Sequence, residues 1–426
     1  MSAAGFRLLF ITADTFPPFR PDVKVLFGKE LRRRGYRADW IMRSTDAHTP
    51  SGLLEWSGGT AWVAATQEGG GRLDRLRKHF ASLRNDARVF GLARSGAYDF
   101  IQVKDKFLAA LMAIVAARWY RVPCFYWLSF PYPEHSLESS RSPLCRYPFF
   151  YRVRGHFFTF VLYKVICRFA DHVFVQSVEM RRAMSEKGVP AEKMTPVPMG
   201  VDLETVSVED PAAPPLAERA PIVVYLGSLE RARRLEFLLE VFAAVADSHA
   251  DAKLYFVGGG DEPDDQPFLE REAERLGIGD RVVFTGFLPR EEALRYVRAA
   301  AVCVALTAAD SCYRVASSTK LIEYMALNKP VLANRHPDQE AVLRESGAGL
   351  CVPWDRQAFA DALAWLLEHR EEARAMGGRG RDYVRRKRAY RSIADDLDAQ
   401  YRRLLQPRGL PDAPRPVPGR FPADGG

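Results

Sequence analysis

The chain has 426 residues, of which 47% are apolar and 27% are charged. This length allows two ordinary domains with separate cores, and the composition excludes an intrinsically disordered protein. The formal net charge of +8 is uneven, because residues 1–205 carry +11 and residues 206–426 carry −3. The basic first half favours anionic partners such as nucleic acid, anionic lipid head groups or phosphorylated substrates.

Strand-like and helix-like runs alternate from the start of the chain. In the first half, strands are predicted at residues 7–12, 38–42, 98–103, 123–130 and 171–177, with helices between them. Residues 205–220 then lose all periodicity and are rich in proline, alanine and acid, which is typical of a linker. The alternation resumes at residue 221. This pattern predicts an α/β protein made of two doubly wound, Rossmann-like domains that face a cleft.

The predicted domains have the following bounds. Residues 1–204 form an acceptor-binding domain, 205–220 the linker and 221–385 a nucleotide-sugar-binding domain, while 386–405 form a helix that packs back towards the first domain. Residues 406–426 lack an apolar period and are expected to be disordered.

The cysteines and the apolar runs indicate in which cellular compartment the protein works. Six widely spaced cysteines form no CxxC pair, which favours free thiols in a reducing compartment over disulfides or a zinc site. The longest apolar run, residues 107–117, is too short to span a bilayer, and the apolar stretch at the N-terminus is too short for a secretory signal. We expect a cytoplasmic protein that is at most peripheral to a membrane.

Three loops of the second half each end a strand and open a helix, which is where doubly wound domains bind ligands. The first contains Gly227 and Ser228, followed by Arg233, whose guanidinium suits diphosphate oxygens. The second, "FVGGGDE", contains Gly258 and Gly259. These loops indicate a site for a phosphorylated ligand.

The third loop opens the helix in "SSTKLIEYMALNKPVLAN", residues 317–334. Ser318 and Thr319 can cap this helix and leave its first amides pointing at an anion. A phosphate there would explain Lys320, and Glu323, one turn further along, could accept hydrogen bonds from ribose hydroxyls. Ordinary helix capping is the alternative that the spacing alone leaves open.

Taken together, these stretches resemble retaining nucleotide-sugar glycosyltransferases of the GT-B fold, of the group 1 (family 4) type. The resemblance covers residues 6–405, with "PVPMGVD", "YLGSL", "VGGGDE", "VVFTGFLP" and "TKLIEYMALNKPVLA" in the family's order. It implies that the second domain binds the sugar nucleotide and the first binds the acceptor. It also implies that Arg233 holds the diphosphate and that Glu323 holds the ribose.

The chain departs from the commoner family pattern at two places. That pattern has two glutamates eight positions apart, and Val315 stands where the first would be. In relatives that also lack it, the residue at the position of Lys320 looks like a second phosphate ligand. Where many relatives carry a Gly-Gly pair after "FPP", this chain has Arg20-Pro21-Asp22.

The resemblance implies a retaining hexosyltransferase that moves a sugar from a nucleoside diphosphate to an acceptor hydroxyl, in cell-surface polysaccharide or glycolipid synthesis. Arg233, Lys320 and the loop amides would stabilise the departing diphosphate. No DxD-type carboxylate pair lies at a strand end, so neither a metal nor another cofactor is expected. On the acceptor side, the candidates are Asp22, Asp105, Ser129 and His135.

Two other functions fit the same fold: a sugar-nucleotide epimerase and an inactive GT-B-like binding module. The expected partners of the transferase are a nucleoside-diphosphate sugar and a sugar or lipid-linked acceptor. Nucleic acid is not expected, because no basic stripe with interleaved aromatic residues belongs to a known module.

Residues 146–154, "RYPFFYRVR", place four aromatic residues among three arginines, and we find no helical or strand period in them. Aromatic rings at the head-group level and arginines attracted to anionic lipid would explain this composition. The segment indicates a peripheral contact with the inner face of a membrane. A lid over the acceptor that never meets lipid is the alternative.

Overall fold

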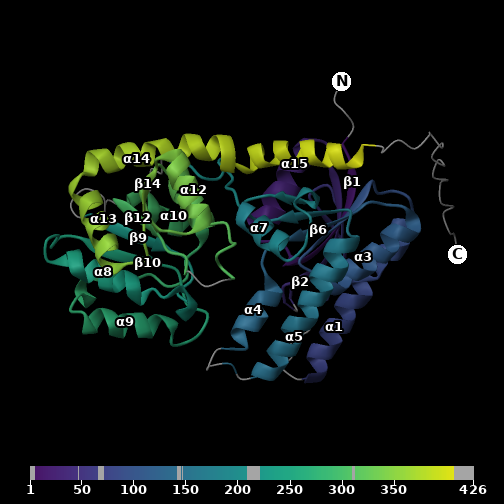
Figure 1. Cartoon of the computed structure of the whole chain (residues 1–426), viewed down its shortest axis with the longest axis horizontal. Helices are drawn as coiled ribbons and strands as arrows, with labels where there is room; N and C mark the ends of the chain where they lie inside the picture. Colours follow the sequence, from purple (N-terminus) through teal and green to yellow (C-terminus); the bar gives the residue numbers. More distant parts are fainter. Residues whose placement is uncertain are drawn as a thin grey trace.

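The structure is a computed structural model that describes residues 5–46, 48–65, 72–141, 145, 147–208, 221–308 and 312–406. Two α/β domains lie side by side, and a long helical segment runs across both of them (Figure 1). The predicted fold class is confirmed. Most of the predicted linker and nearly all of the predicted tail lie outside the described residues.

The first domain is built on an eight-stranded sheet in the order β3-β4-β2-β1-β5-β6-β7-β8. Its strands are β1 (Arg7–Phe16), β2 (Arg37–Ser44), β3 (Gly52–Trp56), β4 (Gly59–Ala64), β5 (Phe100–Lys104), β6 (Cys124–Leu128), β7 (His172–Val175) and β8 (Met194–Pro196). Its helical segments are η1 (Asp22–Leu31), α1 (Arg72–Asp86), α2 (Arg88–Arg94), α3 (Phe107–Tyr120), α4 (Tyr132–Ser139), α5 (Pro148–Phe160), η2 (Val161–Ile166), α6 (Cys167–Phe169), α7 (Val178–Glu186) and η3 (Ala191–Lys193).

The pair β3 and β4 is an antiparallel hairpin at the edge of this otherwise parallel sheet, and the sequence analysis did not predict it. Its two-residue turn is formed by Ser57 and Gly58, both with positive φ (52° and 75°). Such a turn matches the twist of the flanking strands. The glycine between two short apolar runs was the signal that could have revealed the hairpin.

Of the segment 146–154, which we expected to lack a regular period, residues 148–154 are helical, which corrects the sequence analysis; Arg146 lies outside the described residues. Helix α5 begins at Pro148 and continues through η2 and α6 to Phe169 as one rod. Proline is favoured in the first turn of a helix because the amide that it lacks has no partner there.

The second domain has a parallel six-stranded sheet in the order β11-β10-β9-β12-β13-β14. Its strands are β9 (Ile222–Leu226), β10 (Lys253–Val257), β11 (Val282–Phe284), β12 (Val302–Ala305), β13 (Val331–Asn334) and β14 (Gly349–Val352). Its helical segments are η5 (Arg231–Arg233), α8 (Glu236–Ala246), α9 (Asp265–Arg275), η6 (Gly279–Arg281), α10 (Arg290–Ala299), α11 (Thr319–Ala326), α12 (Pro337–Ser346), α13 (Arg356–Glu368), α14 (Arg370–Tyr383) and η7 (Val384–Arg388).

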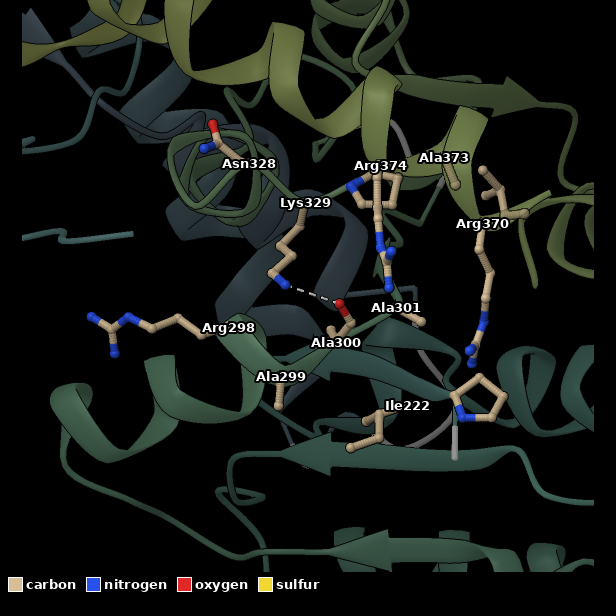
Figure 2. Close-up of a pocket in the computed structure, with 13 residues that line it drawn as sticks. Ile222, Arg298, Ala299, Ala300, Ala301, Asn328, Lys329, Arg370, Ala373 and Arg374 are labelled. Carbon is tan, nitrogen blue, oxygen red and sulfur yellow. Dashed lines mark hydrogen bonds between the residues drawn. The ribbon is translucent and has the colours of Figure 1, made fainter. Parts of the chain in front are cut away.

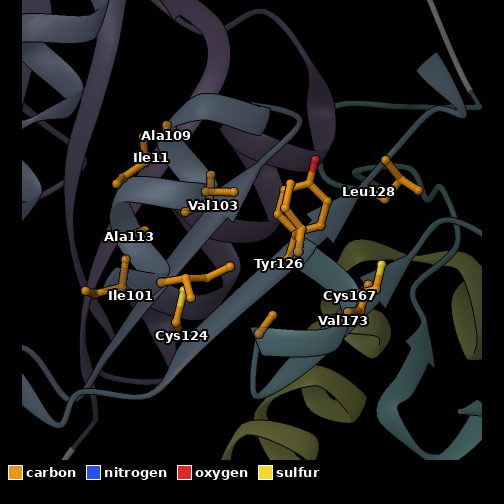
Figure 3. Packing of buried hydrophobic residues seen from close by; sticks show 14 of the residues in the cluster. Ile11, Ile101, Val103, Ala109, Ala113, Cys124, Tyr126, Leu128, Cys167 and Val173 are labelled. Atoms are coloured by element: carbon orange, nitrogen blue, oxygen red, sulfur yellow. The ribbon is translucent and has the colours of Figure 1, made fainter. Parts of the chain in front are cut away.

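Both sheets are covered on their two faces, so their central strands are continuous apolar runs. Figure 3 shows part of the first core, where Ile101 and Val103 of β5 and Tyr126 of β6 pack beside helix α3. All six cysteines of the chain are free thiols. Burial raises the pKa of the Cys167 thiol to about 12, so this thiol is inert at neutral pH.

The last helix, α15 (Tyr390–Leu405), follows the second domain in the chain but packs on the first. Its Tyr401 is fully buried against Phe100 and Phe125, with ring centroids 4.8 and 5.9 Å away. The Tyr36 hydroxyl donates to Asp398 at 2.7 Å. The chain therefore crosses between the domains twice.

Candidate functional site

The loops that follow β9 and β10 are packed so closely that only glycine fits at positions 227 and 258. Gly227 and Gly258 have φ angles of 145° and 141°, which L side chains rarely adopt. A Cβ on Gly258 would lie 2.2 Å from the Gly227 carbonyl oxygen, and one on Gly227 would lie 2.4 Å from Lys320 Nζ. The Leu229 amide donates to the Gly259 carbonyl at 3.0 Å. The two loops therefore form one rigid platform against the lysine.

Lys320 is fixed by Tyr225, the fourth residue of β9. Its Nζ donates to the Tyr225 hydroxyl at 2.6 Å and lies 4.1 Å from the centre of that ring. The Tyr225 hydroxyl in turn donates to the Ser228 carbonyl at 3.2 Å. Burial, together with the nearby positive charge of Arg233, holds the pKa of Lys320 well below its ordinary value. An anion placed at this point would restore the protonated form.

Arg233 lies at the end of η5, in the loop that follows β9. Its guanidinium is 5.6 Å from the centre of the Tyr313 ring, and its Nε is buried without a hydrogen-bond partner. An unsatisfied buried donor on a cation is costly unless something outside the protein bonds it. The two predicted phosphate ligands, Arg233 and Lys320, therefore lie near enough for the charge of one to act on the other.

Glu323 lies one turn after Lys320 on α11, and its side chain is 13% exposed. It pairs with Arg290, whose Nη1 and Nη2 both lie 2.8 Å from Oε1. Burial raises the pKa of Glu323, whereas Arg290 and Lys320 oppose that rise. The sequence analysis missed Arg290. Its signal was an arginine at the first position of a helix, where the helix dipole disfavours a cation unless a carboxylate compensates it.

A pocket of about 400 Å³ lies beside Glu323, Arg290 and the glycine loops. Its volume suits a nucleoside. Its walls combine apolar side chains of the loop before α10 and of α10 itself with polar groups from the glycine loops and α11. The lining is Leu226, Gly227, Ser228, Val257, Gly258, Gly259, Asp261, Phe287, Leu288, Arg290, Ala293, Leu294 and Glu323. A second hollow of about 410 Å³ shares Arg290 and Glu323 with it and is lined elsewhere by Phe19, Pro21, Lys24 and Lys29. The cleft between the domains therefore runs past Glu323.

The start of α11 differs in one respect from the expected phosphate cradle. The Ser318 hydroxyl accepts from the Leu321 amide at 3.5 Å, as a capping residue does, but the Ser318 amide already donates to Asp338 at 3.0 Å. Asp338 is held in turn by the buried Arg388. A carboxylate is stable at this positive helix end. An anionic ligand would therefore meet the amides of Thr319 and Lys320 instead.

Of the acceptor-side candidates, Ser129 and Asp22 are buried in the first domain and Asp105 is partly buried beside Ser129. Ser129 is 2% exposed, and both its amide and its hydroxyl donate to Asp105. Asp22 is also buried, 2.9 Å from Lys104 Nζ and 3.3 Å from Arg20 Nε. These two cations hold the pKa of Asp22 below its usual value although burial opposes them. The group forms a buried ionic network at the carboxyl ends of β1 and β5.

His135, the remaining acceptor-side candidate, faces the second domain. Its Nδ1 lies 3.9 Å from the Cys312 sulfur across the cleft. Val315, on the same loop as Cys312, is 8% exposed and joins the core of the first domain, while its carbonyl accepts from the Ser177 hydroxyl at 2.6 Å. The position where the family pattern has a glutamate is therefore an interdomain contact here.

Figure 2 shows a smaller pocket, of about 140 Å³, at the opposite edge of the second sheet. Its residues Ile222 and Ala301 mark the amino ends of strands, away from the glycine loops. The Lys329 ammonium in it donates to the Ala300 carbonyl at 3.1 Å. In the part of the chain that the structure describes, no group of three or more His, Cys, Asp or Glu side chains could hold a metal ion.

The two halves of the chain match the models of one group of enzymes. Residues 220–369 match the model described as "Glycosyl transferases group 1", and residues 26–200 match the "Glycosyl transferase 4-like domain". These matches agree with the family resemblance seen in the sequence motifs.

Curated relatives share part of the chain. The alpha-monoglucosyldiacylglycerol synthase of Streptococcus pneumoniae is 24% identical over 60% of this chain and 56% of its own length. The GDP-mannose-dependent alpha-(1-6)-phosphatidylinositol monomannoside mannosyltransferase of Mycobacterium tuberculosis is 30% identical over 50% of this chain and 56% of its own length. The chain thus spans little more than half of these relatives.

Among solved structures, the sucrose-phosphate synthase of Thermosynechococcus elongatus superposes with a TM-score of 0.70 at 22% identity. The superposition covers 94% of this chain and 99% of the synthase. At this identity the likeness shows the shared two-domain fold.

Proposed function

Because the chain belongs to the group 1 glycosyltransferases, we propose that it moves a hexose from a nucleoside diphosphate to an acceptor hydroxyl with retention at the anomeric carbon. The observation that carries the proposal is the pair Arg233 and Lys320. One has a buried nitrogen without a partner and the other has a lowered pKa, and both lie beside a glycine platform. A diphosphate would compensate both.

The donor is proposed to lie along the second domain. Its nucleoside occupies the 400 Å³ pocket between the glycine loops and α10, and its ribose hydroxyls donate to Glu323. Arg290 already holds Oε1 of that carboxylate, so Oε2 is the oxygen assigned to the ribose. The diphosphate then reaches Arg233, Lys320 and the amides of Thr319 and Lys320.

In the proposed reaction, the bond between the anomeric carbon and the diphosphate oxygen breaks, and its electron pair leaves with the diphosphate. The acceptor oxygen forms its bond on the same face of the sugar, and its proton passes to the departing phosphate. Arg233 and Lys320 stabilise the charge that develops on the leaving group. No metal and no other cofactor is part of this proposal, since the two cations supply the positive charge.

The acceptor is proposed to be a sugar or a lipid-linked sugar, in glycolipid or cell-surface polysaccharide synthesis. Two curated relatives are named for glycolipids, one as a synthase of monoglucosyldiacylglycerol and one as a mannosyltransferase of phosphatidylinositol monomannoside. His135 faces the second domain across the cleft and is proposed to position the acceptor hydroxyl. A cytoplasmic location is proposed because all six thiols are free.

The test begins with a mass-spectrometric screen of sugar nucleotides for binding. Release of the nucleoside diphosphate is then measured with and without added acceptors, in the wild type and in Arg233→Ala and Glu323→Ala. Each substitution should lower turnover at least 100-fold while the protein stays folded. Arg231→Ala is the matched control, because Arg231 lies in the same turn but pairs with Asp264.

Near-wild-type turnover in both site variants would refute the assignment. An epimerase would convert the donor while releasing little nucleoside diphosphate, and a binding module would release none with any acceptor.

A further inference from the structure

Helix α5 carries a row of exposed apolar side chains along one face. Phe149, Val153, Phe157 and Phe160 follow one another at helical spacing, and between 51% and 79% of each is exposed. Soluble proteins seldom expose so many large apolar groups side by side unless the surface binds something. We therefore expect the exposed apolar face of α5 to bind a partner.

The opposite face of α5 is anchored, so the exposed row cannot simply rotate inwards. Gly155 is buried against α4, and a Cβ at that position would lie 2.6 Å from Leu137 Cδ2. The Arg154 guanidinium donates to the Ser136 hydroxyl at 3.1 Å. This packing turns Phe149 and Phe157 towards solvent.

Helix α3 runs beside the same rod, from the end of α5 to α6, and it also exposes apolar side chains. The rings of Phe107 and Phe158 stack with centroids 4.7 Å apart, and Arg118 Nη2 donates to the Phe169 carbonyl at 3.0 Å. On α3, Val115 and Trp119 are 51% and 77% exposed. Two neighbouring helical elements thus expose apolar side chains.

The charges of these segments have one sign. Residues 107–121 and 147–169 contain no aspartate or glutamate, and their basic residues are Arg118, Arg121, Arg152, Arg154, Lys164 and Arg168. At the end of the rod, Lys164 and Arg168 line a hollow of about 260 Å³ together with Lys193. Exposed aromatic side chains flanked by cations complement the interface of an anionic bilayer, where rings insert at the head groups and cations meet lipid phosphates.

We propose that α5, η2, α6 and the exposed face of α3 form a docking surface for an anionic lipid bilayer. The surface is called the α5 face below. The proposal stands on this surface alone and does not depend on the reaction assigned to the cleft. No helix among the described residues is long and apolar enough to cross a membrane. Helix α4 packs on α5 and carries His135 towards the cleft, so docking would bring the acceptor side of the cleft near lipid.

The experiment is co-sedimentation of the full chain with phosphatidylglycerol vesicles and with phosphatidylcholine vesicles, at low and at physiological salt. The wild type should bind the anionic vesicles, more weakly at the higher salt, and should bind the neutral ones at least tenfold less. Phe149→Ser/Phe157→Ser/Phe160→Ser should abolish binding. Arg152→Gln/Lys164→Gln/Arg168→Gln should weaken binding about fivefold per cation at low salt, which corresponds to about 1 kcal/mol each.

The matched control is Leu53→Ser/Val178→Ser, because both side chains are exposed but lie outside the α5 face. Its binding should equal that of the wild type. Circular dichroism and thermal unfolding show that each variant is folded.

Three outcomes would overturn the proposal: a wild type that stays in the supernatant at both salt concentrations, a triple serine variant that binds like the wild type, or equal binding to neutral vesicles. Sedimentation velocity tests another occupant, a second copy of the chain. A dimer that the serine substitutions dissociate, without vesicle binding, would assign the α5 face to self-association instead.

Discussion

Each domain has a lysine near the carboxyl end of its sheet, Lys104 at the end of β5 and Lys320 in the first turn of α11, and the two charges are compensated differently. In the first domain Lys104 Nζ lies between Asp14 and Asp22, at 2.8 and 2.9 Å, so its charge is neutralised within the protein. In the second domain Lys320 bonds a tyrosine hydroxyl and lies near another cation, Arg233. A lysine that bonds two carboxylates stabilises a loop. Lys320 interacts with Glu230 and Glu323 only through space, so its ammonium is open to an anionic ligand.

The largest expected effect comes from replacing Lys320, the lysine of the second domain. Lys320→Ala should lower turnover about 100- to 1,000-fold, because the leaving diphosphate loses a fixed positive charge. Lys329→Ala is the control, since Lys329 lies at the opposite edge of the same sheet and bonds a backbone carbonyl. Steady-state release of the nucleoside diphosphate measures both. Equal losses in the two variants would mean that Lys320 acts only through stability.

A smaller effect is expected from the platform under the lysine. Gly227→Ala should weaken binding of the nucleoside diphosphate about 10- to 100-fold, because the new methyl group would displace the Lys320 ammonium and strain the loop. Gly378→Ala is the matched control, since nothing lies within 4 Å of a Cβ there. Calorimetric titration compares the two. Unchanged affinity in Gly227→Ala would show that the loop can shift without cost.

A third prediction concerns Val315, whose side chain forms the interdomain contact. Val315→Ala should lower the free energy of unfolding by about 2 kcal/mol, because two buried methyl groups leave the core of the first domain. Val178→Ala, at an exposed position, should change it by less than about 0.5 kcal/mol. Denaturant titration followed by tryptophan fluorescence measures both. An unaffected Val315 variant would mean that the loop does not dock in solution.

The smallest effect concerns acid stability of the first domain. The pKa of Asp22 is lower in the folded than in the unfolded chain, so its contribution is fully present above the unfolded value and is lost as the pH falls through the folded value. Stability should therefore fall with acidification below about pH 4. Asp22→Asn should flatten this slope, as thermal unfolding between pH 3 and 6 would show. An identical slope in Asp22→Asn would remove Asp22 from the network.

Local patterns in the sequence predicted much of the fold. The helix predicted between the strands at 98–103 and 123–130 is α3, because a long apolar run before a strand has few other solutions. The first part of α5, residues 148–154, was missed because its inward side chain Tyr151 is aromatic like its outward ones. A helix that is apolar on two sides has no polar face to mark its period.

The candidate site also has residues that the sequence predicts and residues that it does not. The glycines and cations of the second domain follow short motifs, so their proximity could be expected from the sequence. The pairs Arg290–Glu323 and Arg388–Asp338 join residues that are 33 and 50 positions apart. Nothing in local spacing indicates which of many arginines meets which carboxylate. Ser129 and Asp22, two of the acceptor-side candidates, are buried and bond other polar residues, which the sequence did not indicate because polar residues after a strand can bond each other as well as a ligand.

The central claim is that Arg233 and Lys320 are held ready for a diphosphate. The direct test is calorimetric titration of UDP and of GDP into the wild type and into Arg233→Ala/Lys320→Ala, in buffers of different ionisation enthalpy between pH 7 and 9. Because the pKa of Lys320 is lowered in the unliganded protein, one of the two nucleotides should bind the wild type with uptake of a proton, and the double variant should lose both affinity and uptake. Equal affinity in the two proteins, or no binding of either nucleotide to the wild type, would contradict the claim.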